Sequence, residues 1–303
     1  MSFSLIANAV VLGSVYVVFS SGFTLVYGAF RIMNMAHGAV LTVGAFMGIL
    51  AANHFGWPLA LAAVFAAVAA GLLNLLMDAL VIQPILRRTS SLHGSGEELT
   101  PVVATLAVVG IATGVLYNVV TGVGYVFENA GTVSGTLRVG SLHVSVLDVT
   151  IVLAAIVVSV GINLYINRSA AGVRVRAVAE DRYMAAALGV RPNVTSAGVF
   201  FISGALAGLT GMATGLLYNN VSPAMGEPLL LFGFIIVTVG GIGSLTGTII
   251  ASFIVAFVRV FAANHFSVPV VTMMLFGILL LTLLIRPSGI MGARVLGGGV
   301  SRT

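Results

Sequence analysis

The sequence contains no cysteine and no lysine, and these two absences exclude several kinds of chemistry. Without cysteine there is no disulfide, no thiolate metal site and no cysteine nucleophile. All 13 basic residues are arginine, so a Schiff-base lysine and the lysine of a standard ATP-binding P-loop are also impossible. Any work driven by ATP must therefore come from a partner protein.

Charge is also scarce, and this scarcity identifies the broad class of protein. Only 7% of the 303 residues are charged and 59% are hydrophobic, whereas soluble domains carry about 25% charged residues. The apolar residues suffice for about nine membrane spans of roughly 20 residues each. The sequence therefore predicts an all-α polytopic integral membrane protein, with about eight or nine helices forming one transmembrane domain over residues 1–303.

Nine apolar runs are candidate membrane spans. The first run has no basic residue before Arg31, so it predicts a retained span, because secretory signal peptides begin with basic residues. Glycines interrupt the seventh and eighth runs, which leaves eight spans as the alternative to nine. The runs cover residues 3–30, 35–53, 57–82, 101–121, 147–167, 195–218, 228–242, 246–262 and 268–285.

The arginines lie between these runs, which indicates membrane topology and not nucleic-acid binding. With the N-terminus outside, all except Arg138 and Arg259 fall in cytoplasmic segments. Because cytoplasmic loops are enriched in basic residues, we expect this orientation and, with nine spans, a cytoplasmic C-terminus. The cytoplasmic arginines are then Arg31, Arg87, Arg88, Arg168, Arg174, Arg176, Arg182, Arg191, Arg286, Arg294 and Arg302.

Small residues repeat along the sixth run at helical spacing. Gly204, Gly208, Gly211 and Gly215 are separated by 4, 3 and 4 residues, which places them on one face of a helix. Without side chains there, another backbone can approach closely, as in many helix pairs in lipid. The pattern predicts helix packing within the subunit, with a subunit interface or a moving helix as the alternative.

A second cluster of glycines interrupts the chain at residues 240–244 (GGIGS). Four glycines in eight residues disfavour a continuous helix. Irregular backbone at membrane depth is tolerated only when it is buried in protein or lines a wet cavity. The segment is therefore either a broken or re-entrant hinge beside a pathway or a tight cytoplasmic turn.

Polar residues are rare inside the early runs. Asn34 and His37 open the second run, where they cap the helix, line a cavity or contact a solute. Asp78 is an acid near the end of the third run, and an intramembrane carboxylate is a functional candidate by default. No histidine falls at metal-ligand spacing with a carboxylate, so we expect no bound metal.

The most patterned segment is the charged loop at residues 168–193, which holds five of the 13 arginines and two of the eight acids. Residues 180–188 are typical of a short helix, with acids in the first turn and Gly189 as its stop before Pro192. An ordered helix between two spans on the cytoplasmic face is suited to dock into a groove of a partner and transmit its movement; the alternative is a solvated charged loop.

Several segments resemble one known family, the permease subunits of branched-chain (hydrophobic) amino acid ABC importers of the Liv type. Residues 22–28 (GFTLVYG), 31–38 (RIMNMAHG) and 44–46 (GAF) resemble its first two spans. Residues 176–181 (RAVAED) and 187–190 (ALGV) resemble its cytoplasmic coupling loop. Residues 203–208 (SGALAG), 222–226 (SPAMG) and 239–247 (VGGIGSLTG) resemble its C-terminal half. Together they cover most of residues 20–260.

The resemblance implies the membrane-spanning part of an ATP-driven importer in a bacterial or archaeal cytoplasmic membrane. It implies a second permease subunit, two cytoplasmic ATPase subunits that carry the ATP and magnesium, and a periplasmic or lipid-anchored solute-binding protein that docks on the outer turns 122–146 and 219–227. This chain itself would bind no cofactor. The residues implied in coupling to the ATPase are Arg176, Glu180, Asp181, Ala186 and Gly189, and the candidate pathway residues are Asn34, His37, Ser222, Gly241 and Gly243.

Alternatives remain at the level of substrate and of energy source. Many members of the family have an acid directly after the His-Gly pair, where this chain has Ala39, so urea, short amides or aromatic acids are alternative substrates. A different class is an ion-coupled secondary carrier. Such carriers often use intramembrane ionisable residues, and the few present here, together with the patterned loop, favour a transporter energised from outside.

Overall fold

The computed structural model describes residues 3–89, 96–120, 124–128, 135–139 and 142–292. The described residues are mostly helical, as predicted. They also include a small hairpin, in which β1 (Thr136–Val139) pairs antiparallel with β2 (Leu142–Ser145). The helices are α1 (Phe3–Phe30), α2 (His37–Ile49), α3 (Leu59–Met77), α4 (Gln83–Thr89), α5 (Gly96–Val119), α6 (Val146–Arg168), α7 (Ala170–Glu180), α8 (Arg182–Ala187), α9 (Pro192–Tyr218), α10 (Gly226–Gly240), α11 (Leu245–Ala263) and α12 (Val268–Ile285).

Each of the nine apolar runs contains a helix. Seven helical segments are long and apolar enough to cross a membrane. The remaining two are shorter. Helix α2 continues through a π-helical turn at Leu50–His54. Helix α10 has 15 residues, which at 1.5 Å per residue is about 22 Å and falls short of a hydrocarbon core of about 30 Å.

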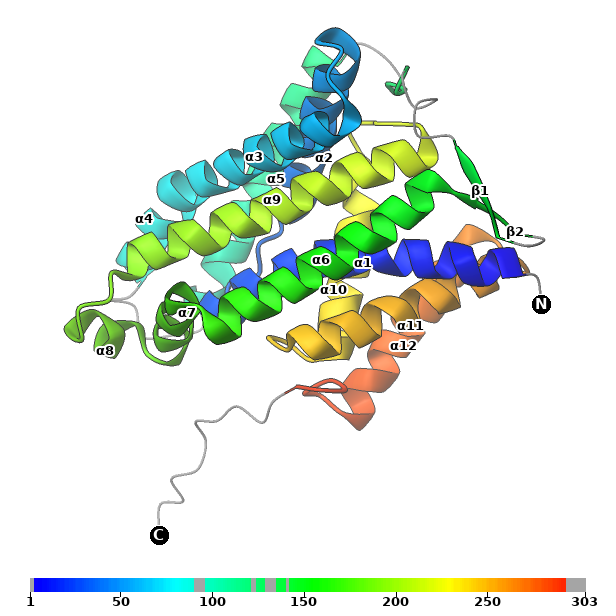
Figure 1. Cartoon of the computed structure of the whole chain (residues 1–303). Coiled ribbons are helices and arrows are strands. Elements are labelled where there is room, and N and C mark those ends of the chain that lie inside the picture. Colours follow the sequence, from blue (N-terminus) through cyan, green and yellow to red (C-terminus); the bar gives the residue numbers. More distant parts are fainter. Residues whose placement is uncertain (1–2, 90–95, 121–123, 129–134, 140–141, 293–303) are drawn as a thin grey trace.

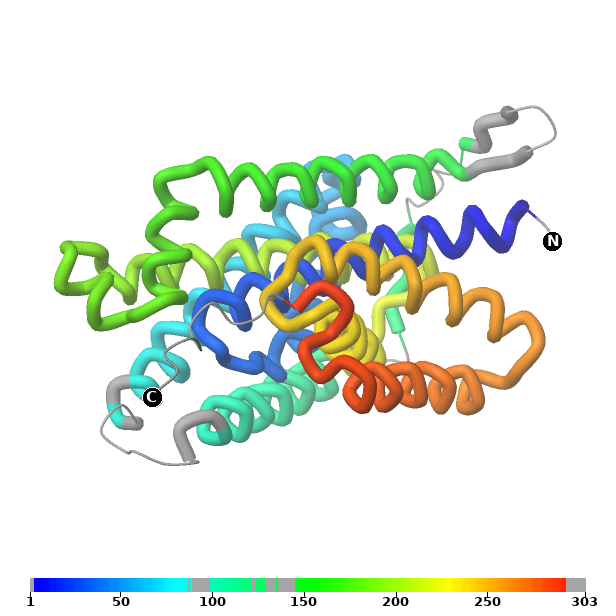
Figure 2. The backbone as a smooth tube through the Cα atoms, turned by 90° about the horizontal axis from the view of Figure 1, so that it is seen from below, coloured from blue at the N-terminus to red at the C-terminus, as the bar shows by residue number. Residues whose placement is uncertain are grey.

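Helices α1 and α9 form the centre of the bundle. Helix α1 packs against α6, α9, α10 and α11, and α9 packs against α2 and α3, so that α6, α9 and α11 each lie beside α1 (Figures 1 and 2). The start of α1 and the α7–α8 pair lie at opposite ends of the bundle (Figure 1); we call these the N-terminal end and the loop end.

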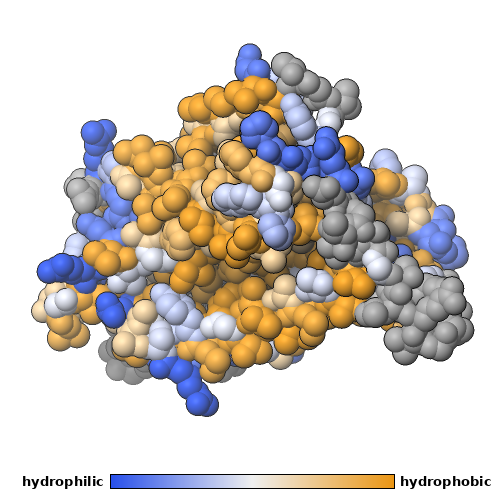
Figure 3. Space-filling model, turned by 45° about the horizontal axis from the view of Figure 1, so that its top comes forward, coloured by the Kyte–Doolittle hydropathy of each residue, from blue (hydrophilic) through white to orange (hydrophobic). Residues whose placement is uncertain are grey.

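The outer helices expose apolar surface. In the most apolar stretch of the central helix α1, 89% of the residues are buried inside the molecule. In the corresponding stretches of the outer helices, only 11% of the residues are buried in α5 and 17% in each of α6 and α12. Hydrophobic side chains cover most of the face drawn in Figure 3, and hydrophilic ones gather toward its margins. Apolar patches of this size need a lipid or protein neighbour, so the chain is a multi-pass membrane protein.

The glycine ladder of α9 faces α2 and α3. A Cβ on Gly204 would lie 2.6 Å from the Ala70 carbonyl oxygen, and one on Gly208 would lie 2.7 Å from the Ala70 Cβ. A Cβ on Gly211 would collide with the Leu41 carbonyl oxygen, and one on Gly215 would meet Val221. All four glycines therefore permit close packing inside the chain, and Gly44 of α2 meets Gly208 from the other side.

Two helices begin inside the bundle and not at its ends. The first, α2, starts at His37, whose Nε2 lies 3.2 Å from the Phe19 carbonyl oxygen in the middle of α1. The other, α10, starts at Gly226, against Gly38 of α2. Residues 31–36 and 219–225 are thus irregular backbone within the molecule, and Ala36 and Val221 are fully buried. Such backbone is tolerated at membrane depth when protein surrounds it.

The glycine cluster at 240–244 forms a turn between two helices. Gly240 ends α10, Gly241 and Gly243 have φ of 106° and 84°, and the Ser244 side chain caps α11 by accepting from the Gly247 N–H at 3.1 Å. Of the two alternatives, the tight turn describes this segment, because glycine adopts positive φ without steric cost. The interruption that enters the bundle lies earlier, at residues 219–225.

Candidate functional site

The charged loop folds into two short helices, and its geometry corrects the predicted single helix over residues 180–188. Asp181 has an extended backbone (φ −152°, ψ 115°). Its carboxylate accepts hydrogen bonds from the backbone N–H groups of Tyr183 at 2.7 Å and Met184 at 2.9 Å. An aspartate with this geometry is a helix N-cap. Asp181 therefore separates α7 from α8, and Glu180 is the last residue of α7 instead of the first turn of the next helix.

Helix α8 ends at a left-handed residue, Gly189, with φ of 85°. The Gly189 N–H donates to the Ala186 carbonyl and the Val190 N–H to the Ala185 carbonyl, each at 3.0 Å. This pair of hydrogen bonds is the Schellman ending, in which glycine supplies the positive φ. A helix of six residues is thus fixed at both ends, by Asp181 and by Gly189.

The surface of α8 is apolar although it projects from the loop end. Tyr183, Met184 and Leu188 are 72%, 66% and 85% exposed. Beside Leu188 lies a groove of about 470 Å³ that Arg174 and Arg191 also line. Large exposed apolar side chains rimmed by polar ones mark a protein interaction site. Among the other coupling candidates, Ala186 is exposed, and the Arg176 guanidinium donates to the Ile166 carbonyl of α6, which ties α7 to that helix.

A chain of hydrogen bonds runs from α8 into the bundle. Arg182 Nη2 donates to Gln83 Oε1 at 3.1 Å and to Asn193 Oδ1 at 2.9 Å. Gln83 Nε2 in turn donates to the Asp78 carboxylate at 3.3 Å, and Ser196 Oγ of α9 donates to the same carboxylate at 2.9 Å. We call these five residues the polar chain.

The polar chain joins α8 to α9 and to the irregular turn at the end of α3. Asp78 is 2% exposed and begins a π-helical turn, Asp78–Ile82, between α3 and α4. Such turns are frequent at functional sites. The sequence pointed to Asp78 but not to Gln83 or Ser196, because neither residue type is unusual near a helix end and their meeting is long-range.

The pathway candidates Asn34 and His37 are buried between helices. Asn34 Nδ2 donates to Asn74 Oδ1 at 3.3 Å, Asn74 Nδ2 donates to the Phe200 carbonyl at 2.7 Å, and Ser203 Oγ lies 3.5 Å from His37 Nδ1. These contacts attach the start of α2 to α1, α3 and α9. In the described structure neither residue lines one of the cavities reported below.

Gly241 and Gly243 lie in the turn at the loop end of α10. A Cβ on Gly243 would lie 3.6 Å from the Gly28 Cα of α1. The segment after α12 pairs with the end of α10: the Ile290 N–H donates to the Val239 carbonyl at 2.8 Å and the Met291 N–H to the Gly240 carbonyl at 2.9 Å. The C-terminus, which we expect in the cytoplasm, falls outside the described residues.

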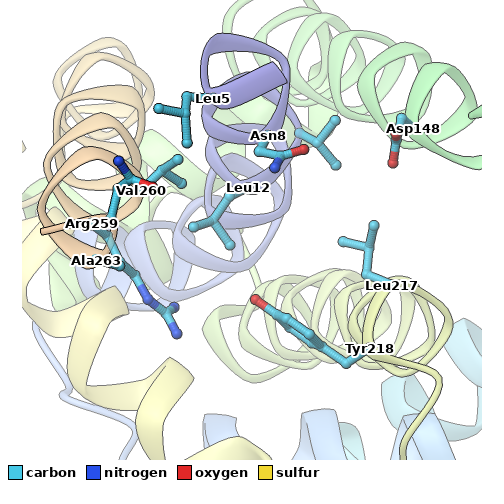
Figure 4. Close-up of a pocket in the computed structure, with 11 residues that line it drawn as sticks. Leu5, Asn8, Leu12, Asp148, Leu217, Tyr218, Arg259, Val260 and Ala263 are labelled. Carbon is cyan, nitrogen blue, oxygen red and sulfur yellow. The ribbon is translucent and has the colours of Figure 1, made fainter. Parts of the chain in front are cut away.

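Two adjoining cavities open toward the N-terminal end. The first, which we call the N-terminal cavity, has about 590 Å³ and lies between α1, α6, α9 and α11 (Figure 4). The second, the inner cavity, has about 230 Å³ and includes Ser222. Leu12, Leu217, Tyr218 and Arg259 line both.

Arg259 stands out in this region because it is a cation within an apolar helix. Its Nη1 donates to Tyr16 Oη, and its Cζ lies 4.5 Å from the centre of the Phe232 ring. The sequence placed Arg259 near the end of a span but gave no partner, because Tyr16 and Phe232 come from distant runs. No group of three histidine, aspartate or glutamate residues that could hold a metal occurs in the described part of the chain.

Comparison with known proteins identifies the family. The model of the family described as "Branched-chain amino acid transport system / permease component" matches residues 5–284. The high-affinity branched-chain amino acid transport system permease protein BraD of Pseudomonas aeruginosa is 28% identical over 302 residues, covering 95% of this chain and 94% of BraD.

Other relatives have the same kind of name. LivH of Escherichia coli K12, also a high-affinity branched-chain amino acid transport system permease protein, is 28% identical and covers 94% of each chain. The probable branched-chain amino acid transport permease protein LivH of Methanocaldococcus jannaschii is 26% identical, covering 95% of this chain and 92% of its own. No solved structure matches significantly.

Proposed function

Because the chain belongs to the branched-chain amino acid transport system permease family, we propose that it is the membrane-spanning subunit of an ATP-binding-cassette importer of branched-chain amino acids. The match to the relatives named for this transport covers nearly the whole length of this chain and of each relative. The substrates are then aliphatic amino acids such as leucine, isoleucine and valine, and the urea, amide and aromatic-acid alternatives have no support from these names.

The structural observation that best supports the proposal is the exposed apolar surface of α8, together with its two fixed ends. It offers three exposed apolar side chains at the loop end, and Asp181 and Gly189 fix both of its ends. Such a helix is suited to insert into a groove of an ATPase subunit. Movement of the ATPase would then reach α3 and α9 through the polar chain. This movement switches the bundle between outward and inward access only if the docked ATPase favours one of these two states over the other.

This function requires partners that lie outside the chain. The proposed importer has a second permease subunit, two ATPase subunits that bind ATP and magnesium, and a solute-binding protein. The loop end would face the cytoplasm of a bacterial or archaeal cell, and the N-terminal end would receive solute. Arg174 of α7, Arg182 of α8 and Arg191, which follows α8, lie at the loop end (Figure 1), which agrees with the basic character of cytoplasmic loops.

Purification in mild detergent, with the associated proteins identified by mass, tests the assembly. Two ATPase chains and a second permease subunit are expected to accompany the chain. A lone chain that carries out uptake in vesicles without ATP would contradict the proposal and favour a secondary carrier.

Replacing Leu188 with serine is expected to weaken retention of the ATPase subunits about tenfold. Burial of a leucine side chain contributes about 1.5–3 kcal/mol, and 1.4 kcal/mol corresponds to tenfold in affinity. The measurement is the dissociation constant of the ATPase from the purified permease. Val173→Ser is the matched control, because Val173 is 55% exposed on the neighbouring α7; equal losses in both variants would argue against docking through α8.

Arg182→Ala and Gln83→Ala are expected to lower ATP-dependent uptake by amounts that do not add. Each variant breaks the same polar chain, so the double variant should be only slightly slower than either single one, with an interaction energy of about 1 kcal/mol. The control is a second double-mutant cycle, which pairs Arg191→Ala with Gln83→Ala. Arg191 belongs to the same loop but has no described hydrogen bond to Gln83, so these two effects should add. Independent effects of Arg182 and Gln83 would show that the polar chain does not transmit the signal.

A further inference from the structure

Arg259 is a cation without a counter-ion in the described structure. Its two neighbours, Tyr16 and Phe232, are neutral aromatic residues that hold its guanidinium in place. No carboxylate of the described residues lies within ion-pair distance of it. Ionisable groups inside a membrane protein are costly, and they typically mark a substrate or ion pathway. Arginine keeps its charge under all physiological conditions, so an anion is the missing partner.

The space beside Arg259 has the size of a small-molecule site. The N-terminal cavity of about 590 Å³ lies within the range of about 300–1,000 Å³ typical of ligand pockets. Figure 4 shows the Arg259 guanidinium and the Tyr218 hydroxyl pointing toward one another from α11 and α9, while the Asp148 carboxylate stands across the cavity on α6. Because Arg259 lines the inner cavity too, it stands where a solute would pass from one cavity to the other.

The chemical groups around this space match those of an aliphatic amino acid. A guanidinium binds a carboxylate with two parallel hydrogen bonds. Leu12 and Leu217 offer apolar surface for a branched side chain, and Asp148 offers a negative charge for an ammonium group. The backbone N–H of Ser145, at the start of α6, also interacts with the Asp148 carboxylate.

We propose that the N-terminal cavity is an amino-acid binding site at the entrance of the pathway, in which Arg259 binds the α-carboxylate and Asp148 faces the α-ammonium group. The inference rests on the proposed function and adds to it a site and a recognition chemistry within the permease itself. A solute released at the N-terminal end would bind here before it passes Arg259.

Because this chain has no cysteine, an introduced thiol can be labelled and followed on this chain within the complete importer. Leu217→Cys places a single thiol between the two cavities. A thiosulfonate reagent with a negative charge is expected to react with it about tenfold faster than one with a positive charge, because the guanidinium attracts anions, and leucine is expected to protect the thiol. Phe55→Cys is the control, since Phe55 is 54% exposed in the turn before α3 and should show neither charge preference nor protection.

Variants of Arg259 complete the test. Adding Arg259→Gln to Leu217→Cys is expected to abolish both the charge preference and the protection by leucine, and to lower uptake at saturating binding protein about tenfold or more. Arg259→Lys keeps the cation and should keep the charge preference. Arg286→Gln, an exposed arginine at the far end of α12, serves as the matched control and should leave all three measurements unchanged.

The outcomes separate the site from the proposed function. If unmodified importer takes up leucine but leucine fails to protect the thiol, the site is wrong and the function stands. A charge preference without protection by leucine would assign Arg259 to another anion, such as a lipid phosphate, and also overturn the site. If unmodified importer takes up no amino acid with ATP present, the proposed function fails.

Discussion

Replacing Gly189 by valine is expected to abolish ATP-driven uptake while the chain remains in the membrane. Gly189 has φ of 85°, and a left-handed conformation costs an ordinary residue roughly 1–2 kcal/mol and a β-branched one more. The substituted chain avoids this cost by giving up the two hydrogen bonds that end α8. Leu188 then moves away from the position in which α8 presents it.

The effect arises from the backbone and not from a steric clash, because a Cβ on Gly189 would meet nothing within 4 Å. The measurement is amino-acid uptake together with hydrolysis stimulated by the binding protein, in vesicles that contain the complete importer. Gly161→Val in α6 is the matched control, since its Cβ would also meet nothing within 4 Å and its φ is not positive. Unchanged uptake and unchanged stimulated hydrolysis in Gly189→Val would contradict the assigned role of α8.

Replacing Gly208 by valine is expected to destabilise the bundle. A Cβ at this position would lie 2.7 Å from the Ala70 Cβ and 3.0 Å from the Ala66 carbonyl carbon, and Gly44 closes the other side. Overpacking a well-packed interior costs about 1–3 kcal/mol, and here backbone on two sides resists the shift. The thermal unfolding midpoint of the purified chain should fall by about 2–10 °C.

Gly198→Val is the control for that experiment. Gly198 belongs to the same helix, α9, but a Cβ there would meet nothing within 4 Å, so the helix-propensity cost is the same and the packing cost is absent. If both variants unfold at the same temperature, close packing at Gly208 does not hold α9 against α2 and α3.

The positions of the helices could be predicted because lipid imposes a simple rule on the sequence. A span must be apolar over its whole length and must satisfy its backbone hydrogen bonds internally, so each apolar run became a helix. The spacing of the ladder from Gly204 to Gly215 likewise predicted a common face. Which helices meet that face required the structure, since α2 and α3 are distant in sequence.

The depth at which helices begin could not be predicted from the apolar pattern. The irregular segments 31–36 (RIMNMA) and 219–225 (NNVSPAM) contain polar residues that are typical of loops outside the membrane, yet they enter the bundle, where protein surrounds them. Hydropathy alone therefore cannot tell the start of α2 at His37 from the end of a membrane crossing.

The candidate site was predicted in its local features and missed in its long-range ones. Gly189 before Pro192 indicated the end of α8 because capping depends on a few neighbouring residues. Asp181 was placed inside the helix instead of before it, because an acid suits both the cap and the first turn. The contacts of Arg182 with Gln83 and of Arg259 with Tyr16 span 99 and 243 residues, and no local pattern encodes such meetings.

The most direct test of the central claim is uptake of leucine by sealed vesicles that contain the chain with its partner subunits and binding protein. We predict that uptake requires ATP on the side of the ATPase subunits and stops when this chain carries Gly189→Val, with the Gly161→Val importer as the active control. Uptake driven by an ion gradient through the chain alone, without ATP, would contradict the claim that this permease is energised through α8.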